Sequence, residues 1–479
     1  MYHANTPFPV YDRDTWWSDA FNPIEYGRDF DFNRPFFEQF KELMNVVPRL
    51  SLNNKEPENS DYCNFSFRNK DSYLLFTSAF NEDCYYSNRT FSSRNSADLS
   101  NSDECELCYE CIDCEKCYQG AWLQNCSNTS ESYLGYNLKN CQNCFGCFNL
   151  SNKKYYIWNQ PYSKEDYFAQ LPTLIKNIQE EKKKFFEQQP QIVKKYMDGL
   201  QNEECSGNSI FHSLRSYDCY EVKNIQDCRW VCNATNMKDA YDVNNDDHSE
   251  LVYEAIGSES NYMHAFNDIC WFNSFSYYNS LCFNSKYIFG CVGLKKNEYC
   301  ILNKQYTKEQ YEELVLKIIE HMKSTGEWGE FFPASLSPFS YNETVAQDYF
   351  PMDQEKALKK GFNWYSPKEK EVKYVGNIYT PPDDIKDVSD EITKNILQCE
   401  NSGEYYKIIA KELTLYRQLQ IPIPKRHPDQ RYKDRLSLRN PRHLWGRNCM
   451  KCNTDIQTSY APDRPEQVYC EKCYLEAVY

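Results

Sequence analysis

The segment Asp61-Tyr-Cys-Asn-Phe-Ser-Phe-Arg-Asn-Lys-Asp-Ser-Tyr-Leu-Leu-Phe-Thr-Ser-Ala-Phe-Asn-Glu-Asp-Cys84 ends in a cysteine 21 residues after its first one, and this interval recurs along the chain. The recurring positions are Cys63, Cys84, Cys105, Cys126 and Cys147, and then Cys228, Ser249, Cys270 and Cys291. A fixed repeat of this length is typical of a solenoid. We therefore predict a mostly β fold with helical additions, in which two tandem parallel β-helix units of about 21 residues per coil stack their cysteines in columns.

An internal duplication supports two such units. The sequence from Gly146 to Tyr167 returns as Gly290 to Tyr311, and each copy ends in a helix-starting Ser or Thr. We expect helical segments over 163–200, interrupted by Pro172 and Pro190, and over 307–324, together with a short helix after Pro35 that closes the first coil. The predicted regions are an N-terminal aromatic cap with a degenerate zinc-ribbon remnant (1–56), a first β-solenoid with capping helices (57–204), a second β-solenoid with a capping helix (205–325), an extended linker or wrapping arm (326–398), and a helix, basic arm and zinc ribbon (399–479).

Composition narrows the class of protein. The 479-residue chain has a net charge of −15, which argues against wholesale coating of nucleic acid. Its first residues lack the pattern of a signal peptide, and no apolar run is long enough to span a bilayer. We therefore expect a cytoplasmic protein whose 24 cysteines are reduced, as packing residues or metal ligands.

The most specific chemical motif lies at the C-terminal end. Cys449 and Cys452 form one C-x2-C pair, and Cys470 and Cys473 form another after 17 intervening residues. This spacing predicts one tetrahedral, structural Zn²⁺ in a zinc ribbon, with a knuckle at each pair and a β-hairpin between them. Asn453 suits the left-handed turn that follows a knuckle.

Other cysteines allow two interpretations. The C-x2-C steps from Cys105 to Cys117 could hold a metal or an iron–sulfur cluster, or they could be packing thiols of one coil. Packing is favoured, because the run lacks the three-residue gap and proline of ferredoxin-type motifs. Two degenerate copies of the ribbon motif, at Asp12 and Thr15 and at Cys399-Glu-Asn-Ser402 with His427-Pro-Asp-Gln430, have too few ligands for zinc.

These motifs carry a family resemblance. The segments 26–40, 162–167 and 439–473 resemble an uncharacterised cysteine-rich zinc-ribbon and β-solenoid family of candidate-phyla (Patescibacteria-type) bacteria. The resemblance implies a bacterial origin and the loss of zinc ligands at Asp12, Thr15, Ser402 and His427. It implies no activity.

For function, we favour a non-enzymatic structural and interaction scaffold that presents rigid solenoid faces and a zinc ribbon to a macromolecular partner. A protein is the favoured partner, and a homo-oligomer stays open. The first alternative is an RNA- or ribosome-binding protein that uses the zinc ribbon and the basic arm 425–447. For the arm itself, the favoured interpretation is a solvated segment that pairs with the acidic body, because the net charge would repel phosphates elsewhere. The nucleic-acid candidates in that arm are Lys425, Arg426, Arg431, Tyr432, Lys433, Arg435, Arg439, Arg442, Trp445 and Arg447.

A second alternative is a carbohydrate-active β-helix enzyme. Its carboxylates would come from the run Asp242 to Asp247, next to His248. Such a run is more often a polar turn between coils. An enzyme is therefore the less favoured class, and no catalytic residue is assigned.

Overall fold

Two long parallel sheets dominate the computed structural model, which describes residues 2–3, 6–366 and 374–478. Residues 367–373 of the predicted linker lie outside this part. The first solenoid contains β3 (Asn54–Lys55), β4 (Asn64–Phe67), β5 (Tyr73–Ala79), β6 (Glu82–Phe91), β7 (Arg94–Ala97), β8 (Ser100–Asp103), β9 (Glu106–Tyr109), β10 (Tyr118–Gln124), β11 (Tyr133–Lys139), β12 (Gln142–Ser151), β13 (Lys154–Ile157) and β14 (Gln160–Pro161). The mostly β fold with two long parallel sheets is therefore confirmed, and it is consistent with tandem β-helix units.

The second solenoid has the same construction. Its strands are β16 (Gly199–Leu200), β17 (Glu203–Phe211), β18 (Leu214–Lys223), β19 (Arg229–Thr235), β20 (Lys238–Asp247), β21 (Glu250–Glu259), β22 (Tyr262–Asp268), β23 (Ser274–Tyr277), β24 (Lys286–Phe289), β25 (Glu298–Ile301) and β26 (Lys304–Gln305). Each strand pairs with its successor in the sequence.

The length of the coil differs from the prediction. Parallel partners such as Cys84 with Ser96 and Val231 with Val243 are four triplets apart in sequence, so one coil is four triplets long rather than seven. The cysteine spacing misled because seven triplets separate successive cysteines of the series, and seven is not a multiple of four. Cys84, Cys105 and Cys126 all face the interior, but they lie on different walls instead of one above another.

The true repeat unit is a triplet. Every third residue from Glu56 to Trp158 has a positive φ, and in most triplets the residue after it is buried, as with Asp83 (φ 53°) and Cys84. Four triplets make a coil, and the left-handed residues turn the chain between walls. The C-x2-C run from Cys105 to Cys117 is thus the inward position of five successive triplets.

Small polar and sulfur side chains fill much of the interior, and aliphatic side chains such as Val231 and Val243 fill the earlier coils of the second solenoid. The amide of Asn81 accepts a hydrogen bond from Ser93 N (2.9 Å) and donates one to Thr90 O (2.7 Å), and Asn267 and Asn279 make an equivalent ladder in the second solenoid. The Cys84 thiol donates to Ser93 O (3.3 Å). Hydrogen bonds between coils therefore add to the cohesion wherever the interior is polar.

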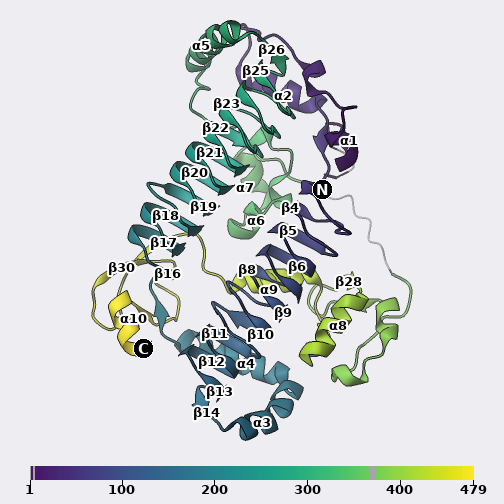
Figure 1. Cartoon of the computed structure of the whole chain (residues 1–479), viewed down its shortest axis with the longest axis vertical. Helices are drawn as coiled ribbons and strands as arrows, with labels where there is room; N and C mark the ends of the chain where they lie inside the picture. The colour runs from purple at the N-terminus through teal and green to yellow at the C-terminus, as the bar shows by residue number, and fades with distance from the viewer. Residues whose placement is uncertain (1, 4–5, 367–373, 479) are drawn as a thin grey trace.

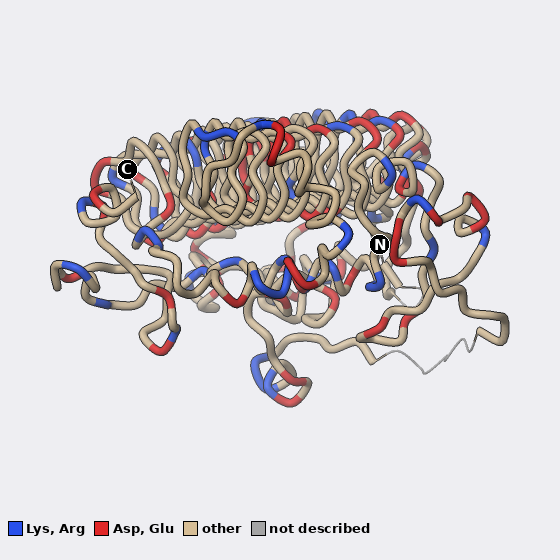
Figure 2. Tube along the Cα trace, turned by 90° about the horizontal axis from the view of Figure 1, so that it is seen from below, with Lys and Arg blue, Asp and Glu red and all other residues tan. Residues whose placement is uncertain are grey.

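The two solenoids run in opposite directions and pack side by side (Figure 1). Phe65 in the first solenoid lies 6.1 Å from the ring of Trp271 in the second, and Arg89 donates to Asn245 (3.4 Å). Most other segments gather on one side of the coil layer (Figure 2).

Helices cover the outer end of each solenoid. Phe185 of α4 (Ile178–Gln188) stacks on Phe148 at the end of the first, and α3 (Lys164–Lys176) precedes α4 at the same end (Figure 1). Thr307 starts α5 (Lys308–Thr325) with the predicted capping box at the end of the second. Pro172 lies within α3 rather than ending it, and the expected helix 163–200 finishes in η2 (Gln189–Gln191) and β15 (Lys194–Lys195).

The N-terminal helix lies elsewhere than predicted. α2 (Phe36–Val46) packs on the last coils of the second solenoid, where Phe36 contacts Phe289 at 5.5 Å, and it does not close the first coil of the first solenoid. The buried carboxylate of Glu327 accepts hydrogen bonds from Phe36 N and Phe37 N (both 2.8 Å). These hydrogen bonds and the aromatic side chains of the last coils of the second solenoid hold α2 in this position.

The remaining elements complete the N-terminal, linker and C-terminal parts. They are β1 (Val10–Tyr11), α1 (Arg13–Trp17), η1 (Pro23–Tyr26), β2 (Arg49–Leu50), η3 (Ala334–Leu336), η4 (Tyr341–Glu343), α6 (Ala346–Tyr349), α7 (Gln354–Lys359), η5 (Ile385–Asp387), η6 (Asp390–Lys394), β27 (Leu397–Gln398), β28 (Tyr405–Tyr406), α8 (Ala410–Leu419), α9 (Pro428–Ser437), β29 (Trp445–Asn448), β30 (Asp455–Thr458), β31 (Val468–Tyr469) and α10 (Glu471–Val478).

Candidate metal centre and basic arm

The four C-terminal cysteines come together. The sulfur atoms of Cys449, Cys452, Cys470 and Cys473 all lie within 4.8 Å of one another, and Cys452 Sγ is 3.7 Å from Cys470 Sγ. Tetrahedral zinc with bonds of about 2.3 Å to sulfur would place its ligands at about this separation. The four cysteines could therefore bind a metal ion such as zinc. In the part of the chain that the structure describes, no other group of three or more His, Cys, Asp or Glu side chains has this geometry.

The backbone around the first pair has knuckle geometry. Cys449 N donates to Thr454 O and Asn453 N donates to Cys449 O (both 2.8 Å), with Asn453 in the predicted left-handed conformation (φ 63°). Burial acts to raise the pKa of the Cys449 thiol, but N–H groups of Cys470 and Cys452 lower it to about 6. A thiol so surrounded is readily deprotonated, as metal binding requires.

The second pair differs from the expected ribbon. The hairpin β29–β30 encloses the first pair, instead of lying between the pairs, and Cys470 and Cys473 sit at the start of α10. Residues 445–478 form the four-cysteine module, which packs against the first solenoid and against the segment that connects it to the second. β31 pairs in parallel with β15, and Asn137 donates to Tyr474 Oη (2.6 Å).

The degenerate ribbon motif at Cys399 has the same backbone geometry as the first cysteine pair. Cys399 N donates to Glu404 O (2.8 Å), Gly403 N donates to Cys399 O (3.0 Å), and Gly403 is left-handed. Burial acts to raise the pKa of the Cys399 thiol, but polar groups that include the backbone N–H of His427, just before α9, lower it. The N–H of Cys470 donates to the Cys449 sulfur at the corresponding position. The knuckle-and-helix geometry thus persists in residues 397–437, where Ser402 replaces the second cysteine.

In the degenerate ribbon motif near the N-terminus, a hydrogen-bonded helix cap stands where the ribbon has cysteines. Asp12 caps α1 by accepting from Thr15 N (2.9 Å) and Thr15 Oγ1 (2.7 Å). β1 pairs in parallel with β2 just as β31 pairs with β15. The two ends of the chain therefore dock through equivalent strand pairs.

Most arginines of the basic arm bind internal carboxylates. Asp98 is fully buried and lies 2.9 Å from Arg431 Nε and 2.7 Å from Arg435 Nη1. Arg431 also contacts the buried Glu412 (3.4 Å). These two guanidinium groups, which the sequence offered as candidates for nucleic-acid binding, pair with carboxylates of the protein itself and hold α9 on the first solenoid.

The next two arginines reach both solenoids. Arg439 lies 3.0 Å from Asp113 in the first and 2.8 Å from Glu221 in the second, and Arg442 lies 2.5 Å from Glu221. Burial acts to raise the pKa of Glu221, but Arg439 and Arg442 lower it to about 2. Sequence reasoning missed Asp98 and Glu221, because no sequence signal marks a single carboxylate among solenoid triplets as a partner for a distant arginine.

The other candidates are scattered. Arg426 pairs with Glu400 and Asp434, Lys425 pairs with Asp383, and Arg447 donates to the carbonyl groups of Ala461 and Glu466. Tyr432 donates to Asp348 (3.4 Å), Trp445 packs on His443, and Lys433 is exposed. The arm brings Arg431, Arg435, Arg439 and Arg442 onto the solenoids and leaves Lys425 and Lys433 toward solvent.

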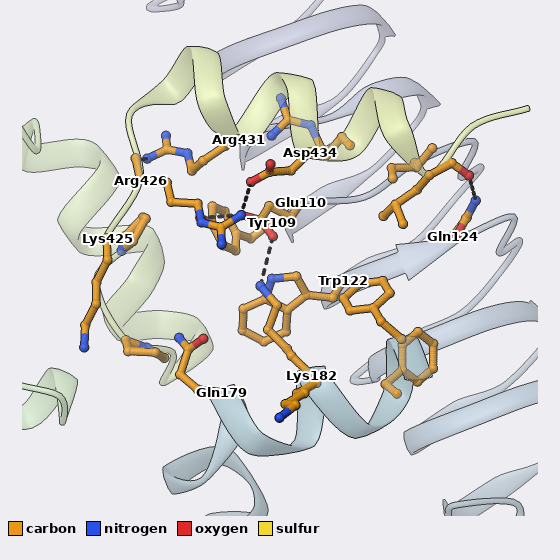
Figure 3. A pocket seen from close by; sticks show the side chains of 18 of the residues that line it. Tyr109, Glu110, Trp122, Gln124, Gln179, Lys182, Lys425, Arg426, Arg431 and Asp434 are labelled. Atoms are coloured by element: carbon orange, nitrogen blue, oxygen red, sulfur yellow. Dashed lines mark hydrogen bonds and ion pairs between the residues drawn. The ribbon is translucent and has the colours of Figure 1, made fainter. Parts of the chain in front are cut away.

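A cavity of about 630 Å³ opens between the first solenoid, α4 and the arm. Figure 3 shows Trp122 and Tyr109 on its solenoid side, with Lys182 beneath and Arg426 and Asp434 above. Lys182 lies 4.6 Å from the ring centroid of Trp122 and 3.3 Å from Glu110. Internal ion pairs thus already balance several of the charges that line this cavity.

The acidic run does not form one site. Asp246 is buried and accepts from Ser249 (2.7 Å), and Asp247 is paired with His248 (3.0 Å) on the outside. Asp242 is an exposed left-handed residue more than one triplet away. The run therefore places its carboxylates on different sides of the coil.

Comparisons with known proteins add little. No family model matches the chain, and no curated protein matches it. A solved structure described as a "putative acetyltransferase" from Desulfovibrio desulfuricans G20 is similar over 46% of this chain and 63% of that chain, less than two thirds of its length, with 9% identity and a TM-score of 0.12. A likeness at that level supports no argument about fold or function. Among the described residues, no helix is long and apolar enough to cross a membrane.

Proposed function

We propose that this chain is a non-enzymatic interaction scaffold whose second solenoid docks a protein partner. The observation that carries the proposal is a row of large side chains in register on successive coils. Tyr217, Tyr241 and Tyr253 are 41%, 46% and 41% exposed, and the register aligns them with Arg229 in one column. Exposed aromatic residues on a rigid support are typical of binding surfaces, because they bury large area with little loss of conformational entropy.

Two further features suit a scaffold. The buried ion pairs of Arg439 with Asp113 and Glu221 join the two solenoids, so residues on their surfaces keep a fixed spacing. The four-cysteine module would hold one structural Zn²⁺, since its four ligand positions are all cysteine and leave none open for chemistry. Its folding energy would come largely from the metal.

The test compares three proteins in capture experiments from the source cell. Tyr241→Ser with Tyr253→Ser removes the row, and Phe76→Ser with Phe80→Ser removes two exposed aromatics of the first solenoid as the matched control. A protein retained by the wild type and the control but lost by the first variant, and then bound directly in purified form, supports the proposal. Identical captured proteins for all three would overturn it.

The RNA-binding alternative has weaker support. Arg431, Arg435 and Arg439 are occupied by carboxylates, so fewer cations remain for phosphate contacts. Binding measured to RNA across a salt series tests it, because phosphate contacts give a steep dependence on salt concentration. The carbohydrate-active alternative lacks a convergent pair of carboxylates in the Asp242 to Asp247 run.

A further inference from the structure

A groove of about 690 Å³ lies beside the exposed tyrosine row. One wall is the second solenoid, and the other comes from Phe331, Phe350 and the arm around His443. Along the solenoid wall, Asp218, Trp230, Asp242 and Glu254 occupy equivalent left-handed positions on four successive coils. Consecutive members of this column are therefore about 4.8 Å apart along the solenoid axis.

The first two members of the column, Asp218 and Trp230, already bind a cation. The Arg229 guanidinium lies 4.3 Å from the ring centroid of Trp230, and its Nη2 is 3.8 Å from Asp218 Oδ2. An aromatic face and a carboxylate on neighbouring coils thus hold one guanidinium group of the chain itself. This combination of ion pair and cation–π contact is a common means of recognising arginine.

The next two coils repeat the arrangement without the cation. Tyr241 and Tyr253 take the place of Arg229 in the outward column, next to Asp242 and Glu254. Within the described residues, neither carboxylate has an ion-pair partner, and the buried Oε2 of Glu254 has no hydrogen bond. Burial raises the pKa of both groups, and the pKa of Glu254 is raised further by Asp242. Two adjacent carboxylates of this kind repel each other, and a bound cation would relieve that repulsion.

The cations near the groove do not fill this role. Arg442 lies against Glu221, and its guanidinium stacks on Tyr349 at 4.1 Å. His443 packs on Trp445 at 4.4 Å. The net charge of −15 adds attraction for a basic partner at long range.

We propose that this groove binds an arginine or lysine side chain from an extended segment of the protein partner, with the cation between Asp242 and Glu254 and its aliphatic stem against Tyr241 and Tyr253. The inference rests on the proposed scaffold function and names the chemistry of its partner. Trp230, which is covered by Arg229, bounds the site on one side. Phe350, which is 58% exposed, offers an apolar contact for the rest of the bound segment.

The test uses the full chain and two fluorescein-labelled peptides, Gly-Ser-Arg repeated four times and Gly-Ser-Glu repeated four times, in fluorescence anisotropy titrations. The arginine peptide should bind and the glutamate peptide should not. Asp242→Asn with Glu254→Gln should weaken binding at least tenfold. Tyr253→Ala should weaken it severalfold, because the aliphatic stem of the bound side chain loses an aromatic ring to pack against.

The matched control is Glu203→Gln with Glu204→Gln, which makes the same change in charge at two exposed carboxylates on an earlier coil. It should bind the arginine peptide within twofold of the wild type. Equal weakening by both double variants would show only general attraction to an acidic protein and would overturn the inference, as would unchanged binding by Asp242→Asn with Glu254→Gln. The scaffold proposal would survive either result if the tyrosine row is still needed to capture a partner, so the two failures are distinguishable.

Discussion

The guanidinium group of Arg439 lies 2.8 Å from the carboxylate of Glu221, and both side chains are buried where the two solenoids adjoin. Arg439 comes from the C-terminal arm and also contacts Asp113 of the first solenoid. One side chain near the end of the chain thus joins two units that are far apart in sequence. The arm thus adds a buried ion-pair bridge to the direct contacts between the solenoids, such as that of Phe65 with Trp271.

Replacing Arg439 should loosen this junction. Arg439→Met would leave Asp113 and part of the Glu221 charge buried without compensation, and we expect the free energy of unfolding to fall by about 3 kcal/mol. Urea titration followed by circular dichroism measures the change. The control Arg417→Met breaks an exposed pair with Asp390 and should cost less than about 1 kcal/mol. Equal losses for both variants would show that the buried junction is not special.

The same pair predicts a dependence on pH. The pKa of Glu221 is about 2 in the folded protein, against 4.5 for an unperturbed glutamate. Because the folded value is the lower one, the stabilisation is complete above about pH 4.5 and is lost as the pH falls toward 2. The difference in unfolding free energy between the wild type and Glu221→Gln should therefore shrink over this range. A difference that stays constant between pH 6 and pH 3 would contradict the assignment.

Sequence patterns predicted a parallel solenoid, the duplication and the four-cysteine cluster, because each depends on local spacing. They gave the wrong coil length, because Cys63 and Cys84 are separated by seven triplets, whereas one coil contains four. Tyr241 and Tyr253 are 12 residues apart and pair on neighbouring coils, so they follow the four-triplet register. The 21-residue spacing of the cysteines is more conspicuous in the sequence and hid this shorter step.

Long-range contacts could not be derived in this way. The sequence allowed Arg431 and Arg435 to contact phosphates or to pair with the acidic body. It could not identify their partner, because Asp98 lies far earlier in the chain and has no distinctive neighbours. The position of α2 on the second solenoid depends on the antiparallel packing of the two units, which no local pattern specifies. Patterns along the chain therefore reported which groups exist, and tertiary structure decided what they bind.

Gly207 is required by a close approach between coils. Its φ is 138°, and a Cβ atom there would lie 1.7 Å from Cys219 O, at a register shift between β17 and β18. Gly207→Ala should destabilise the second solenoid by at least about 2 kcal/mol, because backbone must move. Gly446→Ala is the control, since nothing lies within 4 Å of its Cβ position, and thermal melts should show it unchanged. Similar melting temperatures for both variants would mean that this bulge can relax.

Metal removal should act locally. Purified protein is expected to contain one zinc ion per chain, and a strong chelator should make residues 445–478 sensitive to trypsin while the β-sheet signal of the solenoids persists. Cys473→Ala should lose the metal, whereas Cys399→Ala should keep it. Elemental analysis and limited proteolysis measure both effects. Retention of zinc by Cys473→Ala would place the ion elsewhere.

The preserved frame around Cys399 should accept a metal once ligands are supplied. Ser402, His427 and Gln430 occupy the positions of Cys452, Cys470 and Cys473, and the knuckle hydrogen bonds are already formed. Ser402→Cys, His427→Cys and Gln430→Cys together should raise the zinc content from one to two ions per chain, with tetrahedral thiolate ligands that cobalt substitution would reveal by absorption. The corresponding triple alanine variant should stay at one. If the triple cysteine variant folds, as judged by its β-sheet signal, and still holds a single ion, then the helix start at Pro428 does not reproduce the ligand geometry of α10.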